Sequence, residues 1–330
     1  MDLPILSALF AALSLALYVL LDGFDLGVGA LLLLQRDEAA RNHMIDSITP
    51  TWDGNETWLV MTGITLFASF PIAYGILLPA FYIPVVIMVL ALGLRGVSFE
   101  FRVQIKQYRR RWDLVFGIGS VAAACMQGLI LGGLLQGVSV RDAYFSGSVL
   151  DCWRPFPLLC AITVLTAYMV LGSCWLYLKA TSVARRFAEQ ALHVTLPTFF
   201  VLFGLACFTA PLIQPGIRSA LLTHAAVMVT ILGMMVIAGM LVFTGVRKGI
   251  GHQPFVGALF VLSLGIIGLT VLIFPNVIPF RLSIWEASAS RLTQIVFLIG
   301  AVCVTPVILT YSAFAYWVFR GKTPINGWEG

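Results

Sequence analysis

Long apolar stretches alternate with short polar segments along the whole chain, and this pattern predicts membrane-spanning helices. A helix that crosses the hydrocarbon core of a bilayer needs about 20 apolar residues. Nine stretches fit that length, and proline and glycine punctuate their ends. The predicted spans are 4–34, 48–70, 74–97, 113–137, 156–179, 194–213, 219–246, 254–274 and 289–319. We therefore predict an all-α, polytopic membrane protein that forms a single integral membrane domain over residues 1–330.

The nine spans can be divided into two units of four helices and one final helix. The first unit would cover about residues 1–137, the second about 156–274, and the last helix about 289–319. Spans one and five both end in a leucine-rich turn that an arginine-bearing loop follows. Repeats are common in membrane folds, but the second half lacks the acidic residues of the first. The pattern leaves a 4+4+1 pseudo-repeat and an unrepeated bundle equally open.

The basic residues predict the orientation of the spans. The loops after spans one, three, five and seven, together with the C-terminal tail, hold 15 of the 20 Lys and Arg residues. Because cytoplasmic loops are enriched in Lys and Arg, the N-terminus is predicted to be periplasmic and the C-terminus cytoplasmic. The first span has no basic segment before it and no small-residue cleavage site, so we expect a retained helix and no signal peptide.

The composition excludes several functional classes. Only 11% of the residues are charged, against about 25% in soluble domains. The net charge of +5 comes from short loops, where it sets topology, so no nucleic-acid partner is expected. None of the six cysteines lies in a CxxC motif, and no two of the four histidines share a span at ligand spacing. We therefore expect no metal site, no bound cofactor and no catalytic residue in this chain alone.

Acidic residues interrupt two of the apolar stretches. They lie within residues 20–29 and 50–58 and are Asp22, Asp25, Asp53 and Glu56. An acidic side chain at the centre of a bilayer costs roughly 2.5–3.5 kcal/mol, so such residues usually face a protein interior or a wet cavity. The members of each pair are three residues apart, a spacing that lets them share one helix face. We interpret the four acids as an ion or proton path.

The predicted topology places both acidic pairs at a similar depth. Asp25 lies about ten residues before the cytoplasmic end of the first span, or ~15 Å at 1.5 Å per residue. Asp53 and Glu56 lie roughly 9–14 Å from the cytoplasmic end of the second span by the same rise. A polar funnel that opens to the cytoplasm would have this arrangement. Trp52 and Trp58 bracket the second pair and would form walls of that funnel.

Structural explanations compete with the functional interpretation. The dipole at the start of the second span would favour Asp53 and Glu56. It does not explain why Gly54, which allows close packing, and Asn55, which can form hydrogen bonds, stand between them.

Asp22 and Asp25 could instead form a structural ion pair with Arg95, at the cytoplasmic end of the third span. For Glu100, which lies beside basic residues at the inner membrane surface, a salt bridge and proton capture are equally favoured.

Several long segments together resemble subunit II of the cytochrome bd-type quinol oxidases. They are residues 21–29 (LDGFDLGVG), 50–59 (PTWDGNETWL), 67–71 (FASFP), 95–102 (RGVSFEFR) and 284–293 (IWEASASRLT). The resemblance runs the length of the chain and is densest in the first hundred residues. The chain is short for that family, and in this it is similar to the cyanide-insensitive branch.

The resemblance implies a nine-span subunit of a respiratory-chain enzyme in the bacterial cytoplasmic (inner) membrane, paired as a heterodimer with a homologous subunit I. That partner would carry the haems, b and d or b only, and the quinol site. The complex would oxidise ubiquinol or menaquinol and reduce dioxygen to water with protons taken from the cytoplasm. The resemblance places Asp53 on the cytoplasmic proton path and makes Asp25 another motif acid. It also allows a small single-span accessory subunit, and a structural quinone among the membrane lipids that surround the spans.

Three hypotheses follow. In the first, the chain is the non-haem subunit II of such an oxidase, which scaffolds subunit I and carries protons through Asp25, Asp53 and Glu56. In the second, it is a stand-alone proton- or ion-coupled transporter, which should carry broken helices and a midplane site in both halves. In the third, the oxidase partner is kept and the acids serve assembly only.

Overall fold

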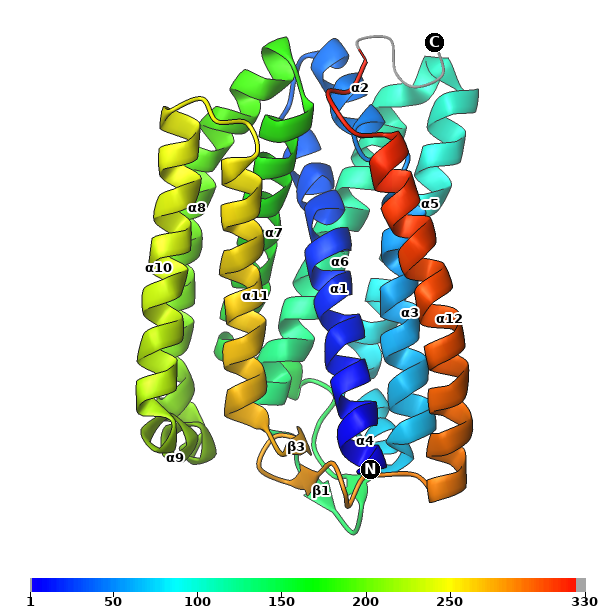
Figure 1. Ribbon diagram of the computed structural model, residues 1–330, viewed down its shortest axis with the longest axis vertical. Coiled ribbons are helices and arrows are strands. Elements are labelled where there is room, and N and C mark those ends of the chain that lie inside the picture. Colours follow the sequence, from blue (N-terminus) through cyan, green and yellow to red (C-terminus); the bar gives the residue numbers. More distant parts are fainter. Residues whose placement is uncertain (1, 325–330) are drawn as a thin grey trace.

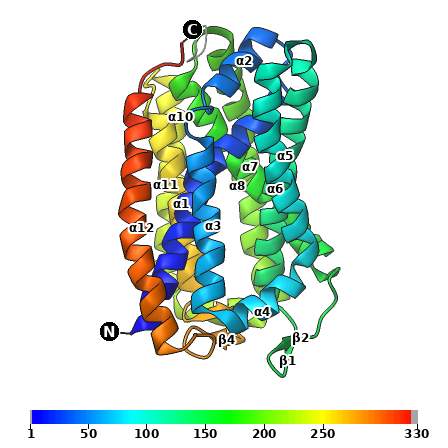
Figure 2. The same cartoon turned by 90° about the vertical axis from the view of Figure 1, so that its right-hand side faces the viewer.

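Eight helices within residues 2–324, the part of the chain that the computed structural model describes, are long and apolar enough to cross a membrane. They run side by side in one bundle (Figures 1 and 2). They are α1 (Leu3–Leu32), α5 (Tyr82–Gln104), α6 (Arg109–Gln136), α7 (Pro155–Lys179), α8 (Ser182–Ile213), α10 (Ala225–Arg247), α11 (Gln253–Ile273) and α12 (Arg291–Val318). The prediction of an all-α, polytopic membrane protein is confirmed.

A further helix, α3 (Trp52–Ser69), lies beside these eight in the position of the predicted second span. It has 18 residues, but Asp53 and Glu56 in its first turns keep it below the apolarity of the others. With α3 the bundle has the nine predicted crossings within residues 2–324, and the described chain begins at one end of the bundle and finishes at the other (Figure 1). The assignment of those ends to periplasm and cytoplasm remains a prediction.

The predicted third span, 74–97, had wrong boundaries. The backbone leaves the helical conformation at Phe70 and again at Phe81, so a short helix, α4 (Pro71–Ala80), precedes α5. Pro71 and Pro84 both lie in the first turn of their helices, where a missing N–H leaves no hydrogen bond unmade. The third crossing therefore begins at Tyr82 and continues to Gln104, beyond the predicted end.

Short elements at the bundle ends were absent from the sequence prediction. The helix α2 (Glu38–Asp46) fills the first predicted cytoplasmic loop, where the Asp37 side chain accepts a hydrogen bond from Ala40 N at 2.7 Å. At the opposite end, α9 (Pro215–Thr223) precedes α10, with the break at His224. The other short elements are the 3₁₀ turns η1 (Lys106–Tyr108) and η2 (Asp151–Trp153) and the antiparallel pairs β1 (Val140–Arg141) with β2 (Tyr144–Phe145) and β3 (Asn276–Ile278) with β4 (Leu282–Ser283).

The helix α1 packs against α3, α6 and α7. Its contact with α7 is a direct approach of backbones: a β-carbon on Gly27 would lie 1.8 Å from the carbonyl oxygen of Tyr168, and one on Gly172 would lie 2.5 Å from Gly27. Only glycine fits at such a distance. This tight packing of α1 on α7 holds Asp22 and Asp25 in a fixed place.

A buried ion-pair cluster closes the end of the bundle that is predicted to be cytoplasmic. The carboxylate of Asp113 on α6 pairs with Arg41 Nε of α2 at 2.9 Å and with Arg102 Nε of α5 at 2.7 Å. Near it, Lys322 in the C-terminal segment donates to the carbonyl oxygen of Leu178 at 2.6 Å. These contacts fasten α2 and the chain end to the bundle. The division into two four-helix units remains a prediction.

Candidate functional site: a buried carboxylate cluster

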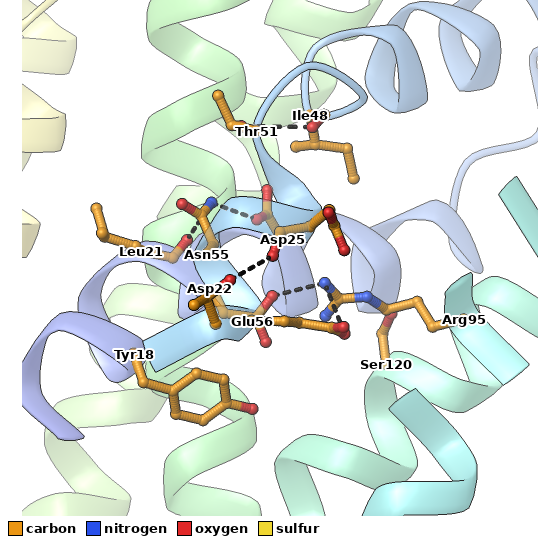
Figure 3. Close-up of polar contacts among 12 residues, drawn as sticks. Tyr18, Leu21, Asp22, Asp25, Ile48, Thr51, Asn55, Glu56, Arg95 and Ser120 are labelled. Atoms are coloured by element: carbon orange, nitrogen blue, oxygen red, sulfur yellow. Dashed lines mark hydrogen bonds and ion pairs between the residues drawn. The ribbon is translucent and has the colours of Figure 1, made fainter. Parts of the chain in front are cut away.

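Arg95 lies at the centre of a charged cluster inside the bundle (Figure 3). It comes from α5, its side chain is fully buried, and its Nη2 lies 2.6 Å from Asp22 Oδ1 and 3.4 Å from Glu56 Oε1. The Asp22 side chain is equally buried, whereas that of Glu56 is 23% exposed. The ion pair between Arg95 and span one was the structural alternative for Asp22 and Asp25, and the structure places it on Asp22.

Asp25 is bound differently from Asp22, although both are fully buried on α1. Its Oδ2 accepts a hydrogen bond from Asn55 Nδ2 of α3 at 2.7 Å, and among the described residues no cation lies within ion-pair distance of it. The same Asn55 nitrogen also donates to the carbonyl oxygen of Leu21 at 3.2 Å. Two carboxylates one turn apart thus have different partners: Asp22 has a guanidinium, and Asp25 has a neutral amide.

The cluster contains more carboxylates than cations. The three carboxylates of Asp22, Asp25 and Glu56 lie near one guanidinium, that of Arg95, which pairs with Asp22 and Glu56 only. A surplus of buried negative charge is costly unless protons or further hydrogen bonds offset it. Within residues 2–324, Asp22 Oδ2, Asp25 Oδ1 and the Nε and Nη1 atoms of Arg95 are buried without a protein hydrogen-bond partner. Buried polar groups are normally paired with protein or with ordered water, so this arrangement is suited to hold protons and water.

Aromatic side chains enclose the cluster on the α5 side. Trp52 stacks on Phe99 with ring centroids 4.9 Å apart, and its ring lies 5.9 Å from the guanidinium carbon of Arg95. Trp58 is fully buried. Gly54 does not provide the close approach that its small size suggested, because a β-carbon there would meet Tyr311 of α12 at an ordinary 3.7 Å.

The other two predicted acids, Asp53 on α3 and Glu100 on α5, lie apart from this cluster. Both are exposed on the surface of the described chain. Asp53 is more exposed than Glu56, since a three-residue step turns the side chain by about 60° around the helix. The ion pair weighed for Glu100 is not formed within residues 2–324.

Two polar groups of the site were missed by the sequence analysis. On α1, Tyr18 accepts a hydrogen bond from Gln127 of α6 at 2.7 Å, and Tyr168 of α7 donates to the same Gln127 side chain at 2.6 Å. The four-residue step from Tyr18 to Asp22 was a usable signal, because it places both on one face of the helix. The other group is Tyr316 of α12, which donates to Asn55 Oδ1 at 3.0 Å. No local pattern marks it.

A comparison with known protein families identifies the family of this chain. Residues 3–319 match the family described as cytochrome bd terminal oxidase subunit II. The chain belongs to this family.

Individual relatives also match nearly the whole chain. The chain is 29% identical to the cytochrome bd-I ubiquinol oxidase subunit 2 of Escherichia coli K12 over 344 residues, which cover 92% of this chain and 91% of that protein. It is 30% identical to a probable cytochrome oxidase subunit 2 of Haemophilus influenzae, with 92% and 91% covered, and 28% identical to the cytochrome bd ubiquinol oxidase subunit 2 of Bacillus subtilis, with 92% of each covered.

The fold of this subunit II is also found in a solved structure. The bd oxidase from Geobacillus thermodenitrificans contains a chain that superposes with a TM-score of 0.79 at 14% identity, over 97% of this chain and 100% of that one. At this identity the likeness shows the fold alone. Membership in the subunit II family agrees with the oxidase hypothesis, and nothing in these comparisons favours the stand-alone transporter.

Proposed function

We propose that this chain is the non-haem subunit II of a bd-type quinol:oxygen oxidoreductase in the bacterial cytoplasmic membrane. The family match over residues 3–319 carries the proposal, and the relatives from Escherichia coli and Bacillus subtilis, which are ubiquinol oxidase subunits, supply the activity. In this role the chain scaffolds subunit I, which holds the haems, b and d or b only, and the quinol site. A structural quinone and a small accessory subunit belong to the same proposal as further components of the complex.

The partner would cover the face that α3 and α5 present to the outside. Asp53 and Glu100 are exposed there, on helices whose other exposed residues are largely apolar, such as Val60, Phe67 and Leu94. A lipid-facing carboxylate within a span is strongly disfavoured. A protein partner that offers hydrogen bonds, cations or water would remove this cost. We therefore infer that subunit I packs on this face and that Asp53 lies in the contact between the two subunits.

The buried cluster would serve proton transfer to the site of dioxygen reduction. Asp22 is paired with Arg95, whereas Asp25 has only the Asn55 amide and is therefore the carboxylate best suited to take up and release a proton. Glu56 lies between the buried cluster and the exposed side of α3. The proposed path uses Asp53, Glu56 and Asp25, with Trp52 and Trp58 as walls. Glu100 would lie on the face of α3 and α5 that subunit I covers.

The test uses the complex purified from native membranes through a tag on this chain. Asp53→Asn and Asp25→Asn remove one ionisable group each at constant size, and Asp142→Asn in the exposed hairpin serves as the control. Haem content comes from dithionite-reduced difference spectra, and turnover from quinol-driven oxygen uptake. We expect both span variants to keep their haems and lose most of their turnover, while the control keeps both.

The other outcomes separate the hypotheses. Wild-type turnover in both span variants would remove the acids from the proton path. Loss of the haem-bearing partner from both would instead support a role in assembly only. A wild-type complex that copurifies with no haem protein and consumes no oxygen would overturn the oxidase function itself.

A further inference from the structure

A small, open groove lies between α3 and α12, close to the carboxylate cluster. Its lining includes Thr51, Gly54, Asn55, Tyr311, Ser312 and Tyr316. Most of these carry a hydroxyl or amide group, which is unusual on the surface of a membrane-spanning helix pair. The hydroxyl of Ser312 is buried and has no hydrogen-bond partner among the described residues. The groove therefore offers hydroxyl and amide groups that can bind water beside the carboxylate cluster.

Two side chains connect this recess to Asp25. Tyr316 donates its hydroxyl to Asn55 Oδ1 at 3.0 Å, and Asn55 donates its Nδ2 to Asp25 Oδ2 at 2.7 Å and to the Leu21 carbonyl at 3.2 Å. A backbone carbonyl can only accept, so the Leu21 contact requires the nitrogen of the amide on that side. The hydroxyl of Tyr316 then secures the oxygen on the other side. The amide can present a donor to Asp25 only in this orientation.

Tyr316 is itself held in place by packing. It is half-buried, and its ring meets that of Trp175 on α7 edge-on, with centroids 6.2 Å apart. A tyrosine with a fixed ring delivers its hydroxyl to one position. The last helix of the chain, which lies outside both predicted four-helix units, thus reaches the carboxylate that the proposed function depends on.

We propose that Tyr316 is a positioning residue for Asp25: through the Asn55 amide it keeps a hydrogen-bond donor on this carboxylate and links it to the polar groove between α3 and α12. The inference rests on the proposed function and adds a residue and a water inlet to it. The charged and titratable groups around Asp25 are Asp22 on α1, Glu56 on α3, Arg95 on α5 and Tyr316 on α12, whereas Tyr18 on α1 and Tyr168 on α7 interact with Asp22. Of these groups on neighbouring helices, Tyr316 acts on Asp25 through the amide that binds it.

The decisive variant is Tyr316→Phe, which removes the hydroxyl and keeps the ring. The Asn55 oxygen then loses the contact that holds it, while only the Leu21 carbonyl still orients the nitrogen, so the hydrogen bond from Asn55 to Asp25 is less firmly held and the carboxylate holds its proton more tightly. We expect a fully haem-loaded complex with several-fold lower oxygen uptake and a pH–turnover profile displaced to higher pH. The infrared band of protonated Asp25, identified by its absence in Asp25→Asn, should shift as well. Tyr144→Phe, in the exposed hairpin, should leave all three unchanged.

A rescue variant separates hydrogen bonding from packing. Tyr316→Gln keeps an N–H donor, so its pH profile should lie closer to wild type than that of Tyr316→Phe. Equal shifts in both variants, or failure of Tyr316→Phe to assemble, would make the residue structural and overturn the inference. An unchanged profile in Tyr316→Phe, beside lost turnover in Asp25→Asn, would overturn the inference and leave the proposed function standing. Full turnover in Asp25→Asn would overturn the proposed function itself.

Discussion

Arg95 and Arg154 form ion pairs of almost equal length. The two pairs therefore permit a direct test of how burial changes the contribution of an ion pair to the free energy of unfolding. The Arg95–Asp22 distance is 2.6 Å with both side chains fully buried, and the Arg154–Asp151 distance is 2.7 Å with side chains 61% and 35% exposed. The perturbation is the same in both places: Arg95→Gln and Arg154→Gln remove the positive charge and keep a polar side chain of moderate length.

The expected effects differ because of what each substitution leaves behind. Removal of one partner from a buried pair leaves an uncompensated charge and costs about 3–5 kcal/mol. Here the cost should reach the upper part of that range, because Glu56 also loses its cation. An exposed pair contributes about 0–1 kcal/mol, since water replaces the lost partner. The two variants should thus differ by roughly 2–5 kcal/mol in the free energy of unfolding.

The assay is denaturation of the purified complex by titration with sodium dodecyl sulfate in mixed micelles, followed through the retained haem spectrum. The double variant Arg95→Gln/Asp22→Asn provides the internal control, because it removes both charges of the pair. It should recover part of the stability that Arg95→Gln loses. Equal losses in Arg95→Gln and Arg154→Gln, or no recovery in the double variant, would refute the reasoning.

Two further predictions concern packing and pH. Gly27→Ala should destabilise the subunit by about 1–3 kcal/mol or more in the same titration, because its β-carbon would overlap the Tyr168 carbonyl. The control Gly63→Ala, whose β-carbon would meet nothing within 4 Å, should stay within about 1 kcal/mol of wild type. A larger loss of stability in Gly63→Ala than in Gly27→Ala would contradict the packing. At the predicted cytoplasmic end, burial lowers the pKa of His43 from 6.5, and its Nε2 accepts a hydrogen bond from Thr181 N at 3.3 Å. Because the unfolded state then binds the proton more readily, this contribution to stability is complete above about pH 6.5 and is lost as the pH falls through the lower folded-state pKa. His43→Gln should therefore flatten the acid side of a plot of stability against pH. An unchanged slope would show that His43 does not contribute to the pH dependence of stability.

The general architecture was predictable because the membrane leaves few alternatives. A run of about 20 apolar residues has to form a helix that satisfies its own backbone, so the spans were found from composition alone. Boundaries were less predictable where helices break without a strong signal. Phe81, for example, separates α4 from α5 in the middle of an apolar stretch. The helix α2 was missed because its buried residues face the ends of other helices, which no local periodicity reveals.

The charged centre of the site was predictable for a related reason. Buried Asp22, Asp25 and Arg95 are conspicuous in apolar segments, and an ion pair of Arg95 with these acids was the structural alternative, which the structure forms with Asp22. The exposure of Asp53 was not predictable, because the sequence of one helix does not say which side faces the rest of the bundle. Tyr316 was equally hidden, since its partner Asn55 is 261 residues away in the chain and tyrosine is common near membrane interfaces.

The limited apolarity of α3 has a consequence for the biogenesis of the protein. A segment leaves the translocon for the bilayer according to its own hydrophobicity, and the two acidic residues in the first turns of α3 oppose that step. The long apolar α1 can enter the lipid first and offer Asp25 to Asn55, but the cation that offsets Glu56 and Asp22 is synthesised later, on α5. The nascent chain therefore reaches its first stable state in the bilayer only when three helices have emerged. The insertion of α1, α3 and α5 is therefore coupled, because the acidic residues are synthesised before the arginine that offsets them.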